Sequence, residues 1–342
     1  MTLLDVPLSL PEVMDGGAGV IRRLVPRLIG LAPVRASLTR GPLATAIVDR
    51  FVAGQTDADA VTVVAGLADL GLRATVDLLG EQVTRSEDAV ATVEAYRRLL
   101  DLADRAGCAC GLDVSVKLSA IGQAVPHDGR KLSYENAAEI AAGAAAVNAT
   151  VTLDMEDHTT TDATLDTVVE LRRDFPSVGA VLQAQLRRTE ADCRDLAREG
   201  SRVRLCKGAY REPAAVVCQG RGAVSAAYAR CLGILVAGPG YPMIATHDPA
   251  LISVASGLIE QVGRASDSYE FQLLHGVRQA EQRRLAARGA TVRVYVPYGP
   301  DSLPYLTRRL VERPANLLLA ARAMGERRAG ATGSARSMRW SA

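Results

Sequence analysis

The chain has 342 residues, of which 48% are hydrophobic and 23% charged, a balance typical of a globular protein with a sizeable core rather than a disordered chain. A formal net charge of +2 and an aromatic content of only 4% give no indication of nucleic-acid binding. The six cysteines have neither the spacing of a disulfide framework nor that of a zinc site, which favours free thiols in a reducing cytoplasm.

Residues 1–60 are predicted to form a helical arm or cap. The N-terminal stretch MTLLDVPLSLPEVMDGG lacks the basic start and apolar run of a signal peptide. From about Leu28 to Leu67, apolar residues recur at spacings of three and four, the period of an amphipathic helix. No uncharged apolar run reaches the roughly 20 residues that span a bilayer. We therefore expect a cytoplasmic protein, with peripheral contact at the inner face of the membrane left open.

Eight short runs rich in valine, leucine and isoleucine then follow, each with the length of a β-strand. They occupy residues 72–81, 112–121, 149–157, 179–185, 201–210, 241–248, 269–276 and 291–299. Amphipathic segments such as residues 86–107 and 136–149 separate them and indicate helices. This alternation favours an α/β fold, a (β/α)8 barrel of the TIM type over residues 61–324. An open doubly wound sheet is the alternative, but no G-x-G-x-x-G motif follows the first strand.

The stretch PYLTRRLVERP, residues 304–314, predicts a short helix with one charged face. At about 100° per residue, Tyr305, Arg308, Arg309 and Glu312 fall on that face, while leucines gather on another. A solvated outer face is the ordinary explanation of such a stripe. Residues 325–342 are small, polar and basic, which predicts a flexible tail.

Polar residues stand at the carboxyl end of nearly every predicted strand, which is the end where (β/α)8 barrels hold their active sites. A buried charge without a partner is costly, so this pattern indicates either a ligand or a dense network of ion pairs. The set comprises Glu81, Lys117, Asp154, Glu156, Gln183, Arg204, Lys207, Thr246, His247, Gln272 and Tyr295.

Some of these residues have alternative interpretations. Lys117 and Asp154 are compatible with a structural ion pair, and Lys117 is also compatible with a Schiff base to a carbonyl substrate. The Lys207-Gly208-Ala209 turn offers a cation and accessible backbone donors to an anionic group, although a tight turn alone explains it equally well. His247 fits a core histidine. The four histidines lack metal-ligand spacing, so no metal site is predicted.

Taken in order, these motifs resemble those of proline dehydrogenase, a family of FAD-dependent enzymes that oxidise L-proline to pyrroline-5-carboxylate. The resemblance runs from about Gly71 to Asn316. Its most specific parts are RLCKGAY (204–210) and YLTRRLVE (305–312), and weaker matches are DLLGE, VSVKLS, LDMED, ATHD, EFQLLHG and VRVYVPYG. The resemblance implies that residues 304–314 form the eighth barrel helix, over the active site.

For the substrate, the resemblance implies that Arg308 and Arg309 bind the proline carboxylate, because paired guanidinium groups match a carboxylate in bidentate geometry. Tyr305, Tyr295 and Leu274 would surround the proline ring. The catalytic residues implied in this way are Lys117, Asp154, Tyr295, Tyr305, Arg308 and Arg309.

The remaining implied roles concern the floor and the mouth of the site. Lys117 and Asp154 would order the floor near the flavin. Glu81 would pair with Arg308 to close the site over bound substrate, and Glu312 would steady the arginine pair.

For FAD, the resemblance implies contacts from Asp154, Gln183, Arg204, Lys207, Gly208, Ala209, Thr246, His247, Gln272 and Glu312. A cation such as Arg204 near the flavin ring would stabilise the reduced, anionic form. Hydride would pass from C5 of proline to flavin N5, and a quinone or another electron acceptor would reoxidise the flavin. The resemblance is to the monofunctional form, whose product passes to a separate pyrroline-5-carboxylate dehydrogenase.

Two positions depart from the family pattern, since Gln185 and Arg211 stand where family members can carry an aromatic residue. The main alternative function is FAD-dependent oxidation of another cyclic imino acid such as hydroxyproline, because one added hydroxyl is hard to exclude sterically. Tyr305 favours proline. More distant alternatives are a Schiff-base lyase that uses Lys117 and a non-catalytic binding barrel.

Overall fold

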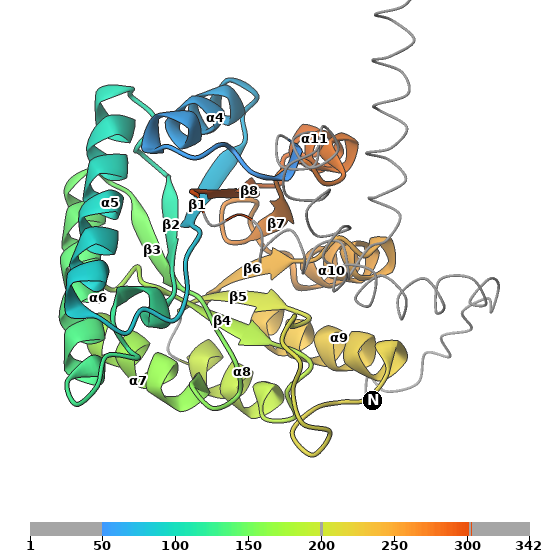
Figure 1. Ribbon diagram of the computed structural model, residues 1–342. Helices are drawn as coiled ribbons and strands as arrows, with labels where there is room; N and C mark the ends of the chain where they lie inside the picture. Colours follow the sequence, from blue (N-terminus) through green and yellow to red (C-terminus); the bar gives the residue numbers. More distant parts are fainter. Residues whose placement is uncertain (1–49, 199–200, 301, 303–342) are drawn as a thin grey trace, which may run out of the picture. The chain divides into compact units, whose positions relative to one another are not determined.

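The computed structural model describes residues 50–198, 201–300 and 302 of the chain. In this part, a closed barrel of parallel strands forms in which each strand pairs with the next in the sequence and β1 pairs with β8 (Figure 1). The strands are β1 (Arg73–Leu78), β2 (Asp113–Val116), β3 (Thr150–Leu153), β4 (Gly179–Gln183), β5 (Arg202–Cys206), β6 (Tyr241–Ala245), β7 (Glu270–Leu274) and β8 (Val292–Tyr298). Each lies within the range predicted for it, and the (β/α)8 barrel is confirmed.

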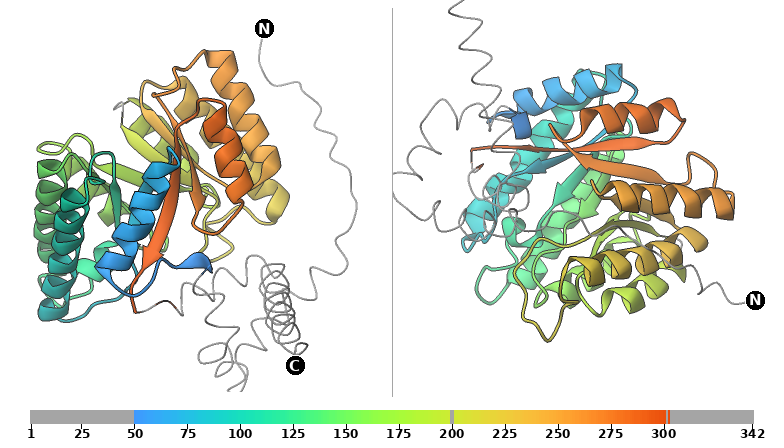
Figure 2. Two further views of the ribbon diagram at one scale, coloured as in Figure 1. Left: turned by 90° about the horizontal axis from the view of Figure 1, so that it is seen from above. Right: turned by 90° about the vertical axis from the view of Figure 1, so that its right-hand side faces the viewer.

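Helices connect the strands and surround the barrel, as two further views show (Figure 2). Helix α4 (Asp57–Asp69) precedes β1. The others are α5 (Ser86–Arg105), the short 3-10 helix η1 (Leu118–Ile121), α6 (Gly129–Ala146), α7 (Thr161–Leu171), α8 (Thr189–Arg198), α9 (Arg221–Ala237), α10 (Pro249–Val262) and α11 (Gln279–Ala287). None of the described helices combines the length and the apolar character needed to cross a bilayer.

The start of α6 differs from the prediction, which placed this helix at residues 136–149. Its first turns bury Gly129 and Ser133, which continue the helical stripe of Asn136 and Ile140. Because these early buried positions are small or polar, apolar periodicity did not reveal them. The helix therefore begins at Gly129.

The helical pattern predicted up to Leu67 is interrupted between residues 52 and 56. Here the backbone bonds to the end of β8 instead: Ala53 N–H donates to the carbonyl of Pro297, and Gly299 N–H donates to that of Gly54, both at 2.9 Å. Gly54 takes a φ of 134°, which glycine adopts readily. Helix α4 then starts with a capping box between Thr56 and Asp59.

Successive residues of each strand point alternately outward and inward. The outward set is apolar and packs against the helices; Val76, Val114 and Leu153 belong to one buried cluster with Leu99 of α5 and Ile140 of α6. Complete burial of such a side chain contributes about 1.5–3 kcal/mol. This layer between strands and helices is the hydrophobic core.

The inward set is polar and includes charges that bond across the barrel. Arg204 of β5, for example, reaches Asp113 and Ser115 on β2. The strands therefore alternate between an apolar face and a polar face, although both faces are buried. The polar interior places chemically active groups at the centre of the fold.

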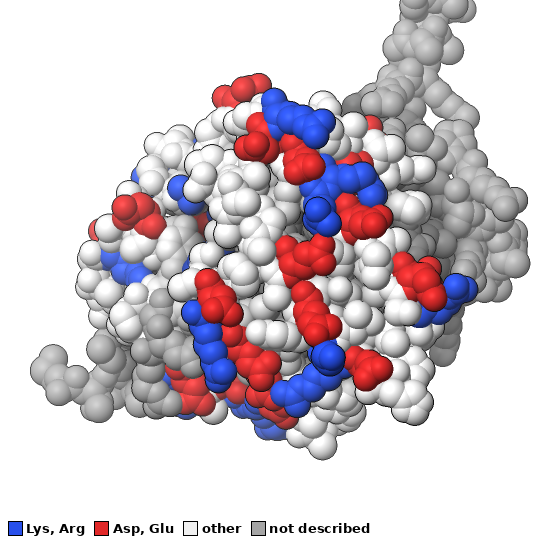
Figure 3. All heavy atoms as spheres, turned by 90° about the vertical axis from the view of Figure 1, so that its left-hand side faces the viewer, with Lys and Arg blue, Asp and Glu red and all other residues white. Residues whose placement is uncertain are grey.

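The outer surface carries its charges differently. On the face drawn in Figure 3, acidic and basic side chains are interspersed. Pairs such as Arg97 with Glu139, at 3.1 Å, and Arg130 with Asp166, at 3.3 Å, connect α5 to α6 and α6 to α7. Exposed pairs of this kind contribute at most about 1 kcal/mol each.

Residues 1–49 of the predicted arm (1–60), the predicted eighth helix at 304–314 and the predicted tail at 325–342 lie outside the described residues. The same holds for Tyr305, Arg308, Arg309 and Glu312. Their roles stay predictions.

Candidate active site

The floor of the candidate site contains a buried lysine between two aspartates. Lys117 directly follows β2, and its Nζ donates to Oδ1 of Asp77 on β1 at 2.5 Å. Oδ2 of Asp154, which follows β3, lies 3.9 Å from the same nitrogen. Burial alone would lower the pKa of Lys117, but the two carboxylates outweigh it and the pKa is raised. Lys117 is therefore held as a cation, with Asp77 as its closest anion.

Arg204 lies between two carboxylates at the centre of the barrel. Its NH1 donates to Ser115 Oγ at 2.7 Å and to Asp154 Oδ1 at 2.8 Å, and its NH2 donates to Asp113 Oδ2 at 3.1 Å. Burial opposes the charge on Arg204, yet Asp154 and Asp113 raise its pKa. Its Nε is buried and has no hydrogen-bond partner in the described part of the chain.

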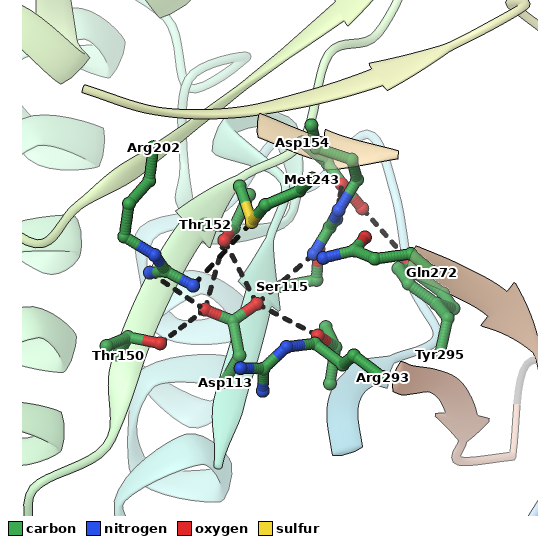
Figure 4. A network of polar contacts seen from close by, with 12 residues as sticks. Asp113, Ser115, Thr150, Thr152, Asp154, Arg202, Met243, Gln272, Arg293 and Tyr295 are labelled. Carbon is green, nitrogen blue, oxygen red and sulfur yellow. Dashed lines mark hydrogen bonds and ion pairs between the residues drawn. The ribbon is translucent and has the colours of Figure 1, made fainter. Parts of the chain in front are cut away.

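Tyr295 of β8 also belongs to this cluster, because it contacts Asp154 (Figure 4). Its hydroxyl donates to Asp154 Oδ2 at 2.8 Å, and its ring centroid lies 5.3 Å from the guanidinium carbon of Arg204. Burial raises the pKa of Tyr295 well above its ordinary value, so the hydroxyl keeps its proton. Leu274 of β7 pairs with Tyr295 in the sheet. Lys117, Asp154, Arg204 and Tyr295, predicted separately from their strand ends, thus meet around Asp154.

A second group lies at the carboxyl ends of β5 and β6. Lys207 Nζ donates to Asp248 Oδ2 at 2.8 Å and to Ser225 Oγ at 2.9 Å. Gly208 has a φ of 101°, and a Cβ there would lie 2.5 Å from Gln185. Ala209 is exposed. The turn is therefore tight and also leaves backbone exposed. A tight turn and a binding site for an anionic group, the two interpretations of this segment, are compatible.

Gln185, one of the departures from the family pattern, supports this turn. Its Nε2 donates to the carbonyl of Tyr210 at 3.2 Å, and its own backbone bonds to Lys207 and Cys218. The amide thus fills the space beneath Gly208 and fixes the course of the loop after β5.

The remaining predicted cofactor residues are held by neighbouring strands. His247 Nε2 accepts from the backbone N–H of Leu274 at 2.8 Å, and Thr246 Oγ1 accepts from that of Asp248 at 3.2 Å. Gln183 Nε2 donates to the carbonyl of Glu156 at 2.7 Å. His247 is thus a half-buried, hydrogen-bonded histidine at the end of β6.

Gln272 lies within β7, whereas Glu81 lies in the loop that follows β1. Gln272 Nε2 donates to Glu270 Oε1 at 2.6 Å, inside the barrel. Glu81 lies in the loop after β1, close enough to Lys117 to contribute to its raised pKa. The partner expected for Glu81, Arg308, is outside the described residues.

Sequence reasoning missed Asp77, Asp113, Glu270 and Arg293, all of which are buried inside the barrel. It selected polar residues at strand ends, whereas these lie within strands. Alternation was the available signal: in β2, Asp113 and Ser115 are two residues apart and share a face with Lys117. Among the described residues, no group of three or more potential metal ligands occurs.

Comparisons with known proteins give the family of the chain. The family model for proline dehydrogenase matches residues 60–318. The proline dehydrogenase of Deinococcus radiodurans is 35% identical over 280 residues, which cover 81% of this chain and 90% of that protein. Proline dehydrogenase 2 of Bacillus subtilis is 35% identical over 276 residues, covering 80% and 89%.

Solved structures show the same fold. Proline utilization A (PutA) from Bdellovibrio bacteriovorus, inactivated by N-propargylglycine, matches with a TM-score of 0.74 and 22% identity. The match covers 87% of this chain and 35% of that one, so the present chain spans about a third of its length.

Proposed function

Since this chain belongs to the proline dehydrogenase family, we propose that it oxidises L-proline to pyrroline-5-carboxylate with FAD as cofactor, the first step of proline catabolism to glutamate. At the coarser level, it is an oxidoreductase that acts on proline. The observation that carries the finer proposal is the cluster at the barrel centre, where Asp154 joins Arg204, Tyr295 and Lys117.

The described residues fit a flavin. The Nε of Arg204 is a buried donor without a partner, which suits an acceptor atom of a ligand in the barrel. Gly208 and the exposed Ala209 bring backbone close to a ligand, and Lys207 adds a cation nearby. Gln183, Thr246, His247 and Gln272 would be the further contacts. When bound, FAD supplies the two-electron acceptor for the hydride that leaves C5 of proline.

The protein's own residues would position charge around the reacting ring. Arg204 is kept cationic and fixed, so it offers positive charge to the reduced flavin without further reorganisation. Tyr295 and Asp154 hold each other in place. Because Asp77 and Asp154 keep Lys117 protonated, it serves as a fixed cation; a Schiff-base role, which requires a neutral amine, is disfavoured.

The substrate would bind beneath the eighth helix. We infer from the family motif that Arg308 and Arg309 bind the carboxylate and that Tyr305, Tyr295 and Leu274 enclose the ring. Glu81 and Arg308 would exclude water when substrate is bound. A quinone or another acceptor would reoxidise the flavin, with peripheral membrane contact, and a separate pyrroline-5-carboxylate dehydrogenase would consume the product.

The test is the visible absorbance spectrum of the purified protein, before and after L-proline is added without oxygen. We expect flavin bands that bleach with proline. Pyrrolidine, which lacks the carboxylate, and hydroxyproline are the comparison compounds. Pyrrolidine should bleach the bands poorly because the arginine pair has nothing to bind. Persistent flavin bands with proline would contradict the substrate, and a protein that takes up no added FAD would contradict the cofactor.

The variant Arg309→Met provides a second arm. It should retain FAD but require a much higher proline concentration for bleaching, since one guanidinium of the pair is lost. Arg283→Met is the matched control, because Arg283 is exposed on α11. An unchanged proline requirement in Arg309→Met would contradict the carboxylate assignment.

A further inference from the structure

We propose that Asp113 is a positioning residue for Arg204, which holds the guanidinium group in place, balances its charge and thereby sets the reduction potential of the flavin. This proposal rests on the proposed function, in which Arg204 faces the cofactor. Asp113 lies just before the VSVKLS motif and outside the motifs quoted above, and it would not touch substrate or flavin itself.

Asp113 is fully buried, with its carboxylate saturated by donors from three strands. Thr75 of β1 donates to Oδ2 at 3.0 Å, Thr150 of β3 donates to Oδ1 at 2.7 Å, and Thr152 lies 3.0 Å from both oxygens (Figure 4). A side chain at Gly179 of β4 would collide with Thr152, so the glycine leaves room for this arrangement. The carboxylate is thus a rigid anion rather than an adaptable one.

This rigid anion fixes the orientation of Arg204. Its NH2 donates to Asp113, while NH1 donates to Ser115 and Asp154. With both terminal nitrogens engaged on different partners, the guanidinium plane cannot rotate, and Nε is left as the buried donor without a partner. Asp113 therefore decides which nitrogen of Arg204 remains for a ligand.

Asp113 also serves a second arginine. Arg202 and Arg204 lie two residues apart on β5 and face the same side, and NH1 of Arg202 is 3.5 Å from Asp113 Oδ1. Two guanidinium groups this close would repel each other in a poorly solvated interior. The shared carboxylate offsets that repulsion, so its removal would leave excess positive charge beside the proposed flavin position.

A matched pair of charges in the same barrel supplies the control. Glu270, also fully buried, binds Arg293 Nε at 2.7 Å. Arg293 NH1 donates to the carbonyls of Ala74 and Gly111, near the amino-terminal ends of β1 and β2, away from the carboxyl ends where the site lies. Neutralising Glu270 changes the interior charge by the same amount, but the arginine that Glu270 contacts is Arg293, and in the described part of the chain Glu270 touches the proposed cofactor residues only through Gln272, whereas Asp113 contacts Arg204 directly.

The experiment compares the midpoint potential of the bound flavin in the wild-type protein, Asp113→Asn and Glu270→Gln, by anaerobic equilibration with a reference dye. Asparagine keeps an oxygen for Arg204 and removes the charge. We expect a shift to more positive potential in Asp113→Asn, at least about twice that in Glu270→Gln, because Coulomb interactions weaken with distance. Equal shifts in the two variants, or an unchanged potential in Asp113→Asn, would overturn the proposal.

Arg202→Met covers the case in which Asp113→Asn does not fold. Arg202 is the first residue of β5 and only partly buried, its guanidinium group reaches Asp113, and methionine retains much of its apolar stem. Losing this cation leaves Asp113 to Arg204 alone, so the potential should shift in the opposite, negative direction. No shift would overturn the proposal. A wild-type protein that binds no FAD would refute the proposed function itself, whereas a wild-type flavin that proline bleaches, with unshifted variants, refutes only the role of Asp113.

Discussion

Single residues in this barrel carry charge in places where charge is costly. Lys117 and Asp77 are both almost fully buried, and their ion pair is 2.5 Å long. Removing one member of such a pair leaves the other unpaired in a poorly solvated interior, which costs more than the pair itself contributes. Burial already raises the pKa of Asp77, a sign that its charge depends on Lys117.

Lys117→Met should therefore lower the free energy of unfolding of the apoprotein by about 3–5 kcal/mol. The double variant Lys117→Met with Asp77→Asn should recover part of this loss, because no unpaired charge then remains. Urea unfolding of the wild-type protein, both single variants and the double variant measures the coupling. Additive losses in the double variant would show that the two residues do not depend on each other.

At the scale of elements, the loop after β7 approaches the segment before α4 so closely that only glycine fits. Gly276 has a φ of 71°, and a Cβ there would lie 1.9 Å from the carbonyl oxygen of Arg50. The loop after α11 offers a contrast, since Gly289 has a φ of 84° with nothing within 4 Å of a Cβ. Backbone conformation constrains both glycines, but space constrains only the first.

Gly289→Ala should cost about 1–2 kcal/mol, the penalty of a left-handed backbone for an L-residue. Gly276→Ala should cost about 1–3 kcal/mol more, because the loop and the segment around Arg50 must separate. Thermal or urea unfolding of the two variants side by side measures the difference. Equal losses would mean that the close approach adds nothing to the conformational penalty.

At the scale of the whole molecule, charged side chains inside the described part of the barrel pair with one another. The carboxylates are those of Asp77, Asp113, Asp154 and Glu270, and the cations those of Lys117, Arg202, Arg204 and Arg293. Because these carboxylates and cations are paired only in the folded protein, folding changes the pKa values of several of them together. Stability should therefore respond to pH where a carboxylate has a strongly shifted pKa.

Glu270 is the clearest case. Burial alone would raise its pKa, but Arg293 outweighs burial and lowers it from the ordinary 4.5 to about 2. A depressed pKa in the folded state stabilises the protein above pH 4.5, and this contribution is lost as the pH falls from 4.5 towards 2. The loss is on the order of 3 kcal/mol, since one pKa unit corresponds to about 1.4 kcal/mol.

Glu270→Gln should remove this part of the pH dependence. The measurement is the free energy of unfolding of both apoproteins between neutral and acidic pH, and the difference between the two curves isolates Glu270. We expect the wild-type advantage to shrink as the pH falls below 4.5. Parallel curves would show that folding does not change the pKa of Glu270.

Much of the fold was predictable from the sequence because strands and helices depend on local periodicity. All eight strands lie within the predicted runs. The two errors have different causes. Helix α6 begins with small or polar residues, which apolar periodicity overlooks. Ala53 and Gly54 bond to Pro297 and Gly299 at the end of β8, a distant segment that no local pattern reveals.

The sequence predicted which strand-end residues belong to the candidate site, but not which residues each of them contacts. Lys117, Asp154, Arg204 and Tyr295 were selected because polar residues at strand ends are unusual in buried strands. Their contacts could not be read from spacing, which suggested Asp154 as the partner of Lys117, whereas Asp77 is the closer anion.

The sequence by itself determined the kinds of elements, their order and the polarity of the strand ends, since each depends on residues that are neighbours in the chain. Only the tertiary structure decided which inward side chains meet. Arg204 and Asp113 are 91 residues apart, and their contact follows from the closure of the barrel and the register of its strands. Register is a property of the assembled sheet, because moving one strand by a single residue would exchange its polar and apolar faces.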